Sequence, residues 1–278
     1  SQRLKEQYPG VTLIAEVYNP AQYRNYLNAG FDYLYDKVGM YDTLRAITCD
    51  RCPTREITRQ WQTVDDIRGR MLYFLENHDE QRIASDHFAG KAEKAIPALI
   101  ISALLHQNPL MVYAGQEFGE RGMEKEGFSG LDGRTTIFDY WCVDTLRRGY
   151  FSRDELTEPE KALAAVYQAV MNIARKEPAV VSGLSYDLMY VNQELGQDQY
   201  AFLRAKGKKA MLVAVNFCDY DLPADITIPA NAFDYLGLKE GKVEATDLLT
   251  DEKISLDLKR NGAVAVTIPA CGGVVLKF

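Results

Sequence analysis

The sequence predicts an α/β fold, in which a parallel sheet with helices packed outside it is followed by an antiparallel β-sandwich. Two observations support this class. Within residues 1–178, four short apolar runs each precede a segment with helical character, whereas apolar and polar residues alternate after about residue 179. A chain of 278 residues is long enough for two domains, which we expect at 1–178 and 179–278.

The composition is that of an ordinary globular protein, with 47% hydrophobic and 26% charged residues. The net charge of −7 argues against a surface that binds nucleic acid or anionic membranes. No window contains the ~18 consecutive apolar residues of a membrane span. We therefore expect neither a nucleic-acid partner nor a membrane span.

The cysteines do not form the pattern of a disulfide framework, because their number is odd and their spacing is irregular. They are Cys49, Cys52, Cys142, Cys218 and Cys271. Cys49 and Cys52 have C-x-x-C spacing, but no second pair or histidine follows them, so ordinary thiols are favoured over a metal or redox site. We expect no metal and no cofactor.

The first strand is expected at residues 11–15, a continuous apolar and β-branched run that is typical of a strand covered on both faces. Glu16 follows it directly. Asn19 and Pro20 then favour the start of a helix, because asparagine is a good N-cap and proline suits the first turn. The second strand, at 31–35, again ends on an acidic residue.

The third strand is expected at residues 71–75 and the fourth at 110–113. Between them, residues 91–106 are apolar on almost every face, which predicts a buried helix that tolerates Pro97 in its first turns. The expected helices of the first domain are 1–8, 19–27, 41–47, 57–70, 91–106 and 158–176. Because native chains rarely begin in the middle of a helix, the first of these also indicates a fragment.

The second domain shows strand periodicity of two. Ile254, Leu256 and Leu258 alternate with polar residues, and Asn261-Gly262 turns the chain into a second alternating run. This pattern predicts a β-hairpin. Further strands are expected at 200–203, 210–217 and 273–278, which together complete an antiparallel β-sandwich.

Polar side chains follow all four strands of the first domain. Right-handed crossovers place the carboxyl ends of parallel strands at one edge of the sheet, where ligands bind in such folds. This edge would carry Glu16, Asp36, His78, Asp79 and Glu117. Each residue alone also has an ordinary explanation, since a carboxylate can pair with an arginine and a histidine can be hydrogen-bonded in the core.

Three motifs occur in order at these strand ends. They are Ala15-Glu16-Val17, the run Phe-Leu-Glu-Asn-His-Asp at 74–79, and Tyr-Ala-Gly-Gln-Glu at 113–117. Their order, spacing and strand context resemble the α-amylase superfamily of glycoside hydrolases. The resemblance implies that the chain comprises strands five to eight of a TIM-type (β/α)8 barrel followed by the C-terminal β-sandwich of that family.

The resemblance also implies roles for individual residues. Glu16 corresponds to the general acid/base, Asp79 to the carboxylate that stabilises the transition state, and His78 to a hydrogen-bond donor to the sugar. The remaining substrate-binding candidates are Asn77, Arg82, Gln116, Tyr140 and Trp141. Two carboxylates around an oxocarbenium-like transition state are the chemistry that a retaining glycosidase requires.

The chain departs from the family pattern at the nucleophile, which is an aspartate in an Arg-x-Asp motif on strand four. No such motif precedes Glu16, and Gly30-Phe31-Asp32 begins a strand rather than ending one. We therefore expect a fragment without strands one to four that is inactive by itself. The missing half of the barrel, or a second copy, would cover the free edges at 11–16 and 110–113.

The function implied by the resemblance is retaining hydrolysis of α-glucosidic bonds in starch-like glucans. One alternative is an amylase-like protein that binds or assembles without catalysis; such proteins typically lose the acidic residues that this chain keeps as Glu16 and Asp79. A glucan transglycosylase or an isomerase would use the same residues. Linkage preference, chain-length preference and cellular compartment stay open at this level.

Overall fold

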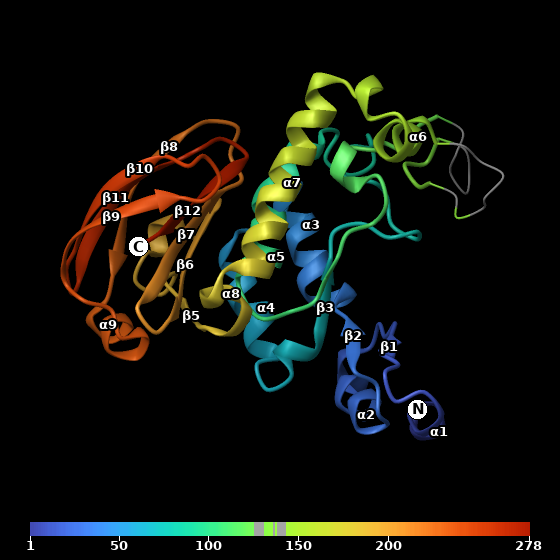
Figure 1. Ribbon diagram of the computed structural model, residues 1–278, viewed down its shortest axis with the longest axis horizontal. Coiled ribbons are helices and arrows are strands. Elements are labelled where there is room, and N and C mark those ends of the chain that lie inside the picture. The colour runs from blue at the N-terminus through green and yellow to red at the C-terminus, as the bar shows by residue number, and fades with distance from the viewer. Residues whose placement is uncertain (125–130, 136, 138–142) are drawn as a thin grey trace.

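A parallel sheet opens the chain and antiparallel sheets close it (Figure 1). The computed structural model describes residues 1–124, 131–135, 137 and 143–278. The parallel strands are β1 (Ile14–Ala15), β2 (Tyr33–Tyr35), β3 (Met71–Phe74) and β4 (Leu110–Met111). They are hydrogen-bonded in the order β1-β2-β3-β4, so the sheet is open and does not close into a barrel.

The two outer strands are shorter and more exposed than the sequence predicts. β1 and β4 contain two residues each, and Ile14 is 48% exposed. The prediction that every parallel strand is covered on both faces is therefore wrong for β1 and β4, although all four residues of β3 are buried. An outer strand has a neighbour on one side only, so fewer of its backbone groups are paired.

Helices follow the parallel strands, although the helix expected at 57–70 ends at Thr63 and α6 was not predicted. They are α1 (Gln2–Gln7), α2 (Tyr23–Asn28), α3 (Asp42–Thr48), α4 (Arg55–Thr63), α5 (Ile96–Leu104), α6 (Asp144–Phe151), α7 (Glu158–Lys176), α8 (Pro178–Ser182) and, in the C-terminal part, α9 (Ala230–Leu236). Shorter turns are η1 (Pro20–Gln22), η2 (Lys37–Tyr41), η3 (Arg68–Arg70), η4 (Ala92–Ala95), η5 (Gln116–Phe118), η6 (Arg153–Glu155) and η7 (Gln193–Leu195).

The longest helix, α7, has the predicted limits because local signals fix its start. Thr157 accepts a hydrogen bond from the Glu160 backbone, and the Glu160 side chain accepts one from the Thr157 backbone, which completes a capping box. The expected helix at 91–106 is instead divided into η4 and α5, with Pro97 in the first turn of α5. All of α5 after its first residue is buried, as predicted.

The C-terminal part contains a six-stranded antiparallel sheet in the order β10-β9-β12-β7-β6-β5 and a two-stranded sheet of β11 and β8. Their limits are β5 (Leu184–Asp187), β6 (Gln199–Lys206), β7 (Lys209–Asn216), β8 (Leu222–Ile228), β9 (Gly241–Asp247), β10 (Lys253–Leu258), β11 (Gly262–Ile268) and β12 (Gly272–Lys277).

The predicted hairpin between β10 and β11 is wrong. β10 pairs with β9, whereas β11 pairs with β8, so the turn at Asn261 connects two different sheets. Leu256 and Leu258 on β10 and Val264 and Val266 on β11 are nevertheless buried in the same core. Alternating sequences give the same signal whether two strands pair edge to edge or face each other across a core.

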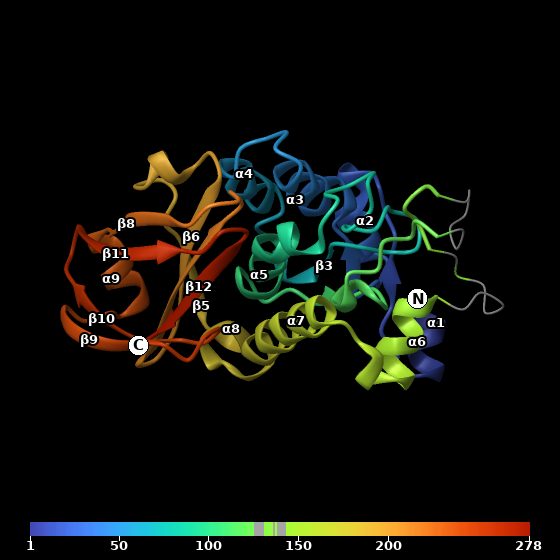
Figure 2. The same cartoon turned by 90° about the horizontal axis from the view of Figure 1, so that it is seen from above.

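Helices α5, α7 and α8 lie between the parallel sheet and the C-terminal sheets (Figures 1 and 2). Arg204 of β6 fixes this junction, because its buried guanidinium donates to the carbonyl oxygens of Leu105, Ala179 and Val180 at 2.8 to 3.1 Å. A charged group is stable at such depth only when its donors are satisfied. No helix of the described residues is long and apolar enough to cross a membrane.

Asp36, at the end of β2, is a structural cap rather than an exposed group. It is 3% exposed, and its Oδ1 accepts a hydrogen bond from the backbone N–H of Met40 at 3.1 Å, which begins η2. Burial raises the pKa of this carboxyl to about 6, and backbone hydrogen bonds from Met40 and Gly39 oppose the rise. Ionised Asp36 therefore costs folding free energy.

The raised pKa of Asp36 gives a pH-dependent prediction. Because the folded-state pKa lies above the unfolded value of ~3.9, the stabilising contribution of Asp36 is complete at low pH and is lost as pH rises through about 6. We expect Asp36→Asn to gain stability relative to wild type on going from pH 4 to pH 8, by up to about 3 kcal/mol. Urea denaturation at the two pH values measures this difference.

The exposed Asp225→Asn replacement on β8 is the matched control for that experiment, since no ion pair of Asp225 occurs among the described residues, and its effect sets the baseline for the change with pH. An Asp36→Asn effect that does not change with pH would contradict the raised pKa.

Candidate active site

The loop after β3 is shaped by Asn77. This side chain is buried, and its Oδ1 accepts hydrogen bonds from the backbone N–H groups of Asp79 and Glu80, both at 2.9 Å. The resulting turn projects His78 and Asp79 outwards, with 38% and 50% of their side chains exposed. The His78 Nε2 lies 3.4 Å from the Asp79 Oδ2, so the two polar groups face one another at the surface.

A buried ion pair holds the base of the same loop. The Arg82 Nη1 donates to the Glu76 Oε2 at 2.7 Å, and each side chain is no more than 2% exposed. The Glu76 Oε1 also accepts from the backbone N–H of Ile83 at 2.7 Å. Arg82 further donates to the Thr135 hydroxyl and the Ala114 carbonyl oxygen. Every polar atom in this list is therefore paired, as burial requires.

The predicted substrate contact of Arg82 is consequently revised. Its guanidinium is 4.2 Å from the centre of the Tyr113 ring and is enclosed by the loop that it supports. Asn77 has a similar role, because its side-chain oxygen already accepts a hydrogen bond from the backbone of the loop. We now expect both residues to orient the loop rather than touch a sugar.

Glu80 connects this loop to α3 and η2. Its carboxylate accepts from Arg45 at 2.9 Å and from the Tyr41 hydroxyl at 3.2 Å, and the Lys37 ammonium lies 3.2 Å away. Arg45 also donates to the Gln81 side chain at 2.7 Å. Two cations therefore neutralise Glu80, while Asp79 beside it has no cation among its described ion-pair partners other than His78.

Glu16 lies directly after β1 and is exposed. The Tyr18 hydroxyl donates a hydrogen bond to its Oε1. That bond is the largest reason why the pKa of Tyr18 is raised, and the carboxylates of Asp79 and Glu80 raise it further. Glu16 follows β1 and Asp79 follows β3, with one strand between them, so both belong to the carboxyl edge of the parallel sheet.

A second tyrosine supports this placement. Tyr35 belongs to β2, which separates β1 from β3 in the sheet. Burial raises the pKa of its phenol, and the charges of Glu16 and Asp79 raise it further. Its hydroxyl donates to the Met111 sulfur at 3.5 Å, so the ring extends across the sheet. Tyr35 therefore lies on the strand between the two that Glu16 and Asp79 follow.

Gln116 and Glu117, after β4, face the helices rather than this group. The buried Gln116 Nε2 donates to the Tyr167 hydroxyl of α7 at 2.9 Å. Glu117 accepts from the Gly115 backbone and from the Tyr150 hydroxyl of α6. We therefore expect Gln116 to hold β4 against α7 rather than to bind a sugar. The predicted sugar contacts Tyr140 and Trp141 lie outside the described residues.

Two features of the site were missed from the sequence. Tyr18, two residues after Glu16, was not considered, although residues separated by two on an extended segment point to the same side. Glu76 was also overlooked as a partner for Arg82. A glutamate just after an apolar strand needs a buried cation, and Arg70 and Arg82 are equally near along the chain, so the sequence offered two candidates.

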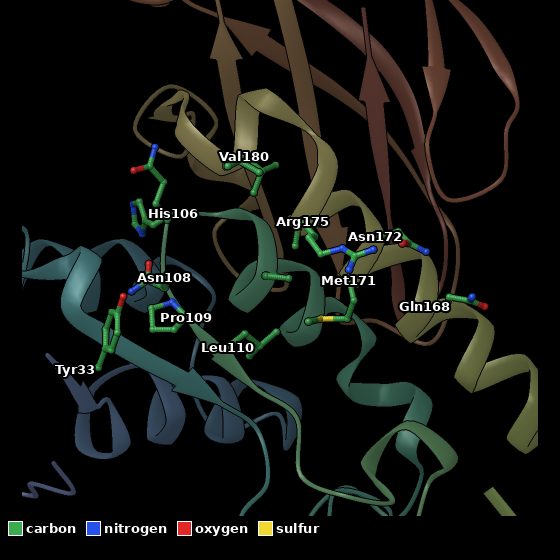
Figure 3. A pocket seen from close by; sticks show the side chains of 14 residues that line it. Tyr33, His106, Asn108, Pro109, Leu110, Gln168, Met171, Asn172, Arg175 and Val180 are labelled. Atoms are coloured by element: carbon green, nitrogen blue, oxygen red, sulfur yellow. The ribbon is translucent and has the colours of Figure 1, made fainter. Parts of the chain in front are cut away.

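Two cavities of about 730 Å³ each lie away from these carboxylates, along the free edge of β4 and α7. Figure 3 shows one of them, where Met171, Asn172 and Arg175 of α7 surround the same hollow as Asn108 and Leu110. Gln168 and Met171 line both cavities. Among the residues that the structure describes, no group of three or more His, Cys, Asp or Glu side chains could hold a metal ion.

Solved α-amylases share this fold. The α-amylase from Geobacillus thermoleovorans complexed with acarbose is 16% identical with a TM-score of 0.71, over 99% of this chain and 55% of that one. The α-amylase from H. orenii is 20% identical with a TM-score of 0.69, over 99% and 55%. A maltogenic α-amylase from Thermotoga neapolitana is 16% identical with a TM-score of 0.65, over 100% and 57%.

This chain therefore spans a little over half the length of the solved proteins that it resembles. No curated protein matches the sequence significantly. The family model described as the α-amylase catalytic domain matches residues 4–179, which is more than half of the chain. On that match, the chain belongs to the α-amylase family of glycoside hydrolases.

Proposed function

We propose that this chain supplies the second half of the catalytic barrel, strands five to eight, of a retaining glycoside hydrolase that cleaves α-glucosidic bonds in starch-like glucans. The barrel part is residues 1–178 and the β-sandwich is 179–278. Membership of the α-amylase family supports the reaction class. Structural relatives crystallised with acarbose and with maltose support an α-glucan as the substrate.

The observation that carries this proposal is the position of Glu16 and Asp79. Both follow strands of one parallel sheet, β1 and β3, at its carboxyl edge. Glu16 accepts a hydrogen bond from the phenol of Tyr18, and Asp79 lies beside the ring of His78. Among the described residues, neither carboxylate forms an ion pair with a lysine or an arginine. Charges that serve only stability are usually paired.

In the proposed reaction, each of these side chains has a separate role. Glu16 protonates the glycosidic oxygen as the bond breaks and later accepts a proton from water. Tyr18 holds the Glu16 carboxyl in place through its hydrogen bond. Asp79 remains ionised and stabilises the positive charge that develops on the sugar ring. His78 donates a hydrogen bond to a sugar hydroxyl.

A retaining reaction also requires a nucleophilic carboxylate about 5 Å from the acid. We propose that it lies on the first half of the barrel, which would pair with the free edges of β1 and β4. The two hollows along β4 and α7 support this arrangement, since their linings include Leu110, Val112 and Met171. Apolar surface beside an unpaired strand favours another layer of protein. A second copy of the chain is the alternative occupant.

Replacement of either acid in the complete protein should abolish most turnover. We expect Glu16→Gln and Asp79→Asn to lower kcat on soluble starch by about 10²- to 10⁴-fold each, because one removes the proton donor and the other the stabilising charge. Reducing-sugar release measures the rate. The control is Glu244→Gln, which alters an exposed carboxylate paired with Lys253 on the C-terminal sheet. Activity close to wild type in either site variant would favour a non-catalytic scaffold.

Activity should also depend on the other half of the barrel. We expect the 278-residue chain alone to release no reducing sugar, since the described strand ends provide no nucleophile in position. Co-expression with the first half of the barrel should restore hydrolysis. Met171→Asp places a charge in both hollows and should prevent that recovery. Hydrolysis by the chain alone would contradict the proposed division of the site.

A further inference from the structure

The loop after β4 packs against the loop after β3, which carries His78 and Asp79. Arg82, at the end of the loop after β3, donates its backbone N–H to the Gly133 carbonyl oxygen at 2.6 Å. The Thr135 hydroxyl accepts from the Arg82 Nη2 at 2.7 Å and from the Arg82 Nε at 3.1 Å. Hydrogen bonds from both the backbone and the side chain of Arg82 therefore connect the two loops.

Thr135 completes the pairing of the buried guanidinium. Arg82 and Thr135 are 1% and 2% exposed. Glu76 accepts from the Arg82 Nη1, whereas Thr135 is the one acceptor of the Arg82 Nε within the part of the chain that the structure describes. A buried charged donor without an acceptor is costly. Loss of the Thr135 hydroxyl would therefore leave the Nε unpaired and favour movement of the guanidinium away from Glu76.

The two loops approach each other closely at Gly133. A methyl group on Gly133 would lie 2.7 Å from both the Cβ and the Oγ of Ser85, which is fully buried. The φ angle of Gly133 is +81°, in the left-handed region where a side chain is strained. Glycine therefore permits the approach through which the Gly133 carbonyl oxygen reaches the Arg82 backbone.

An ion pair at the surface joins the same two loops. The Arg121 Nη2 donates to the Asp86 Oδ1 at 2.7 Å, and both side chains are more than half exposed. Exposed ion pairs contribute little to stability, because water and salt screen the charges. The buried hydrogen bonds of Arg82 therefore contribute more than this ion pair to holding the loops together.

We propose that Thr135 and Gly133 are positioning residues of the active site, which hold Arg82 and, through it, the loop that presents Asp79. A carboxylate that stabilises a transition state must be placed accurately, since a misplacement of about 1 Å can cost roughly 100-fold in rate. The effect on rate rests on the proposed function of the protein. The control of the position of the loop does not.

Replacement of the Thr135 hydroxyl in the complete protein tests the effect on rate. Thr135→Val keeps the shape of the side chain and removes the acceptor, whereas Thr135→Ser keeps the acceptor. We expect Thr135→Val to lower kcat on soluble starch by about tenfold to 100-fold with a smaller change of KM, because Asp79 acts on the transition state rather than on the bound substrate. Thr135→Ser should retain most of kcat. The control, Arg121→Gln, removes the exposed ion pair between the same loops and should leave kcat unchanged.

Hydrogen–deuterium exchange of the backbone tests the positioning without any substrate. The N–H groups of Asp79 and Glu80 donate to the buried Asn77 side chain, so their exchange reports on the order of the loop after β3. We expect Thr135→Val to speed exchange in the peptide that covers residues 77–82 by about fivefold or more, as loss of a hydrogen bond does. Peptides from β6 and β7 should exchange at wild-type rates.

Gly133→Ala is a second variant, which separates the loops without removing an acceptor from the guanidinium. Its methyl group would meet Ser85, so kcat and exchange should change in the same direction as in Thr135→Val. Gly207→Ala is the matched control, because Gly207, between β6 and β7, has a φ angle of +63° and open space around it. This control shares the backbone strain but not the close approach, and it should leave kcat unchanged.

Three results would overturn the proposal. They are wild-type kcat in Thr135→Val, a loss in Thr135→Ser as large as that in Thr135→Val, and faster exchange throughout the chain in both Thr135→Val and Gly133→Ala, which would show a general loss of stability. Faster exchange confined to residues 77–82, in a complete protein that hydrolyses no glucan, would refute the proposed function and leave the control of the loop by Thr135 intact.

Discussion

The buried ion pair between Glu76 and Arg82 is the constraint on which the candidate site depends. Glu76 lies shortly after β3 and Arg82 closes the loop that follows, so the hydrogen bond of 2.7 Å between them fixes both ends of the segment that presents His78 and Asp79. Arg82 also donates to Ala114 after β4, which ties two strand ends together. Removal of one partner from such a pair costs about 3–5 kcal/mol, because the other charge stays buried. Glu76 and Arg82 are both buried, yet together they determine the position of the exposed Asp79 carboxylate.

The strand order of the parallel sheet determines where Glu16 lies relative to Asp79. β2 lies between β1 and β3, so Glu16 and Asp79 are separated by one strand, and Tyr35 on that strand is influenced by both. Cleavage of a glycosidic bond, in which positive charge develops on the sugar ring, needs a protein acid and a protein anion beside the same bond.

The sequence predicted elements with strong local signals. Helix α7 has the limits that were predicted, and β3 and α5 are buried as predicted, although α5 begins only at Ile96. It could not predict pairings decided at long range. Alternation in β10 and β11 fits a hairpin and a contact across two sheets equally well, and only tertiary packing decides. The hydrogen-bond partners of Asn77 and Arg82 could not be predicted for the same reason, since they become visible only after folding.

The central claim, that Glu16 is the proton donor and Asp79 the stabilising anion of one reaction, is tested most directly by changing the leaving group. In the complete protein, kcat/KM should be compared for a starch oligosaccharide and an aryl α-glucoside whose phenol leaves without protonation. The account predicts that Glu16→Gln lowers the first value at least about 100-fold and the second far less, whereas Asp79→Asn lowers both. Equal losses for both substrates in Glu16→Gln would contradict it.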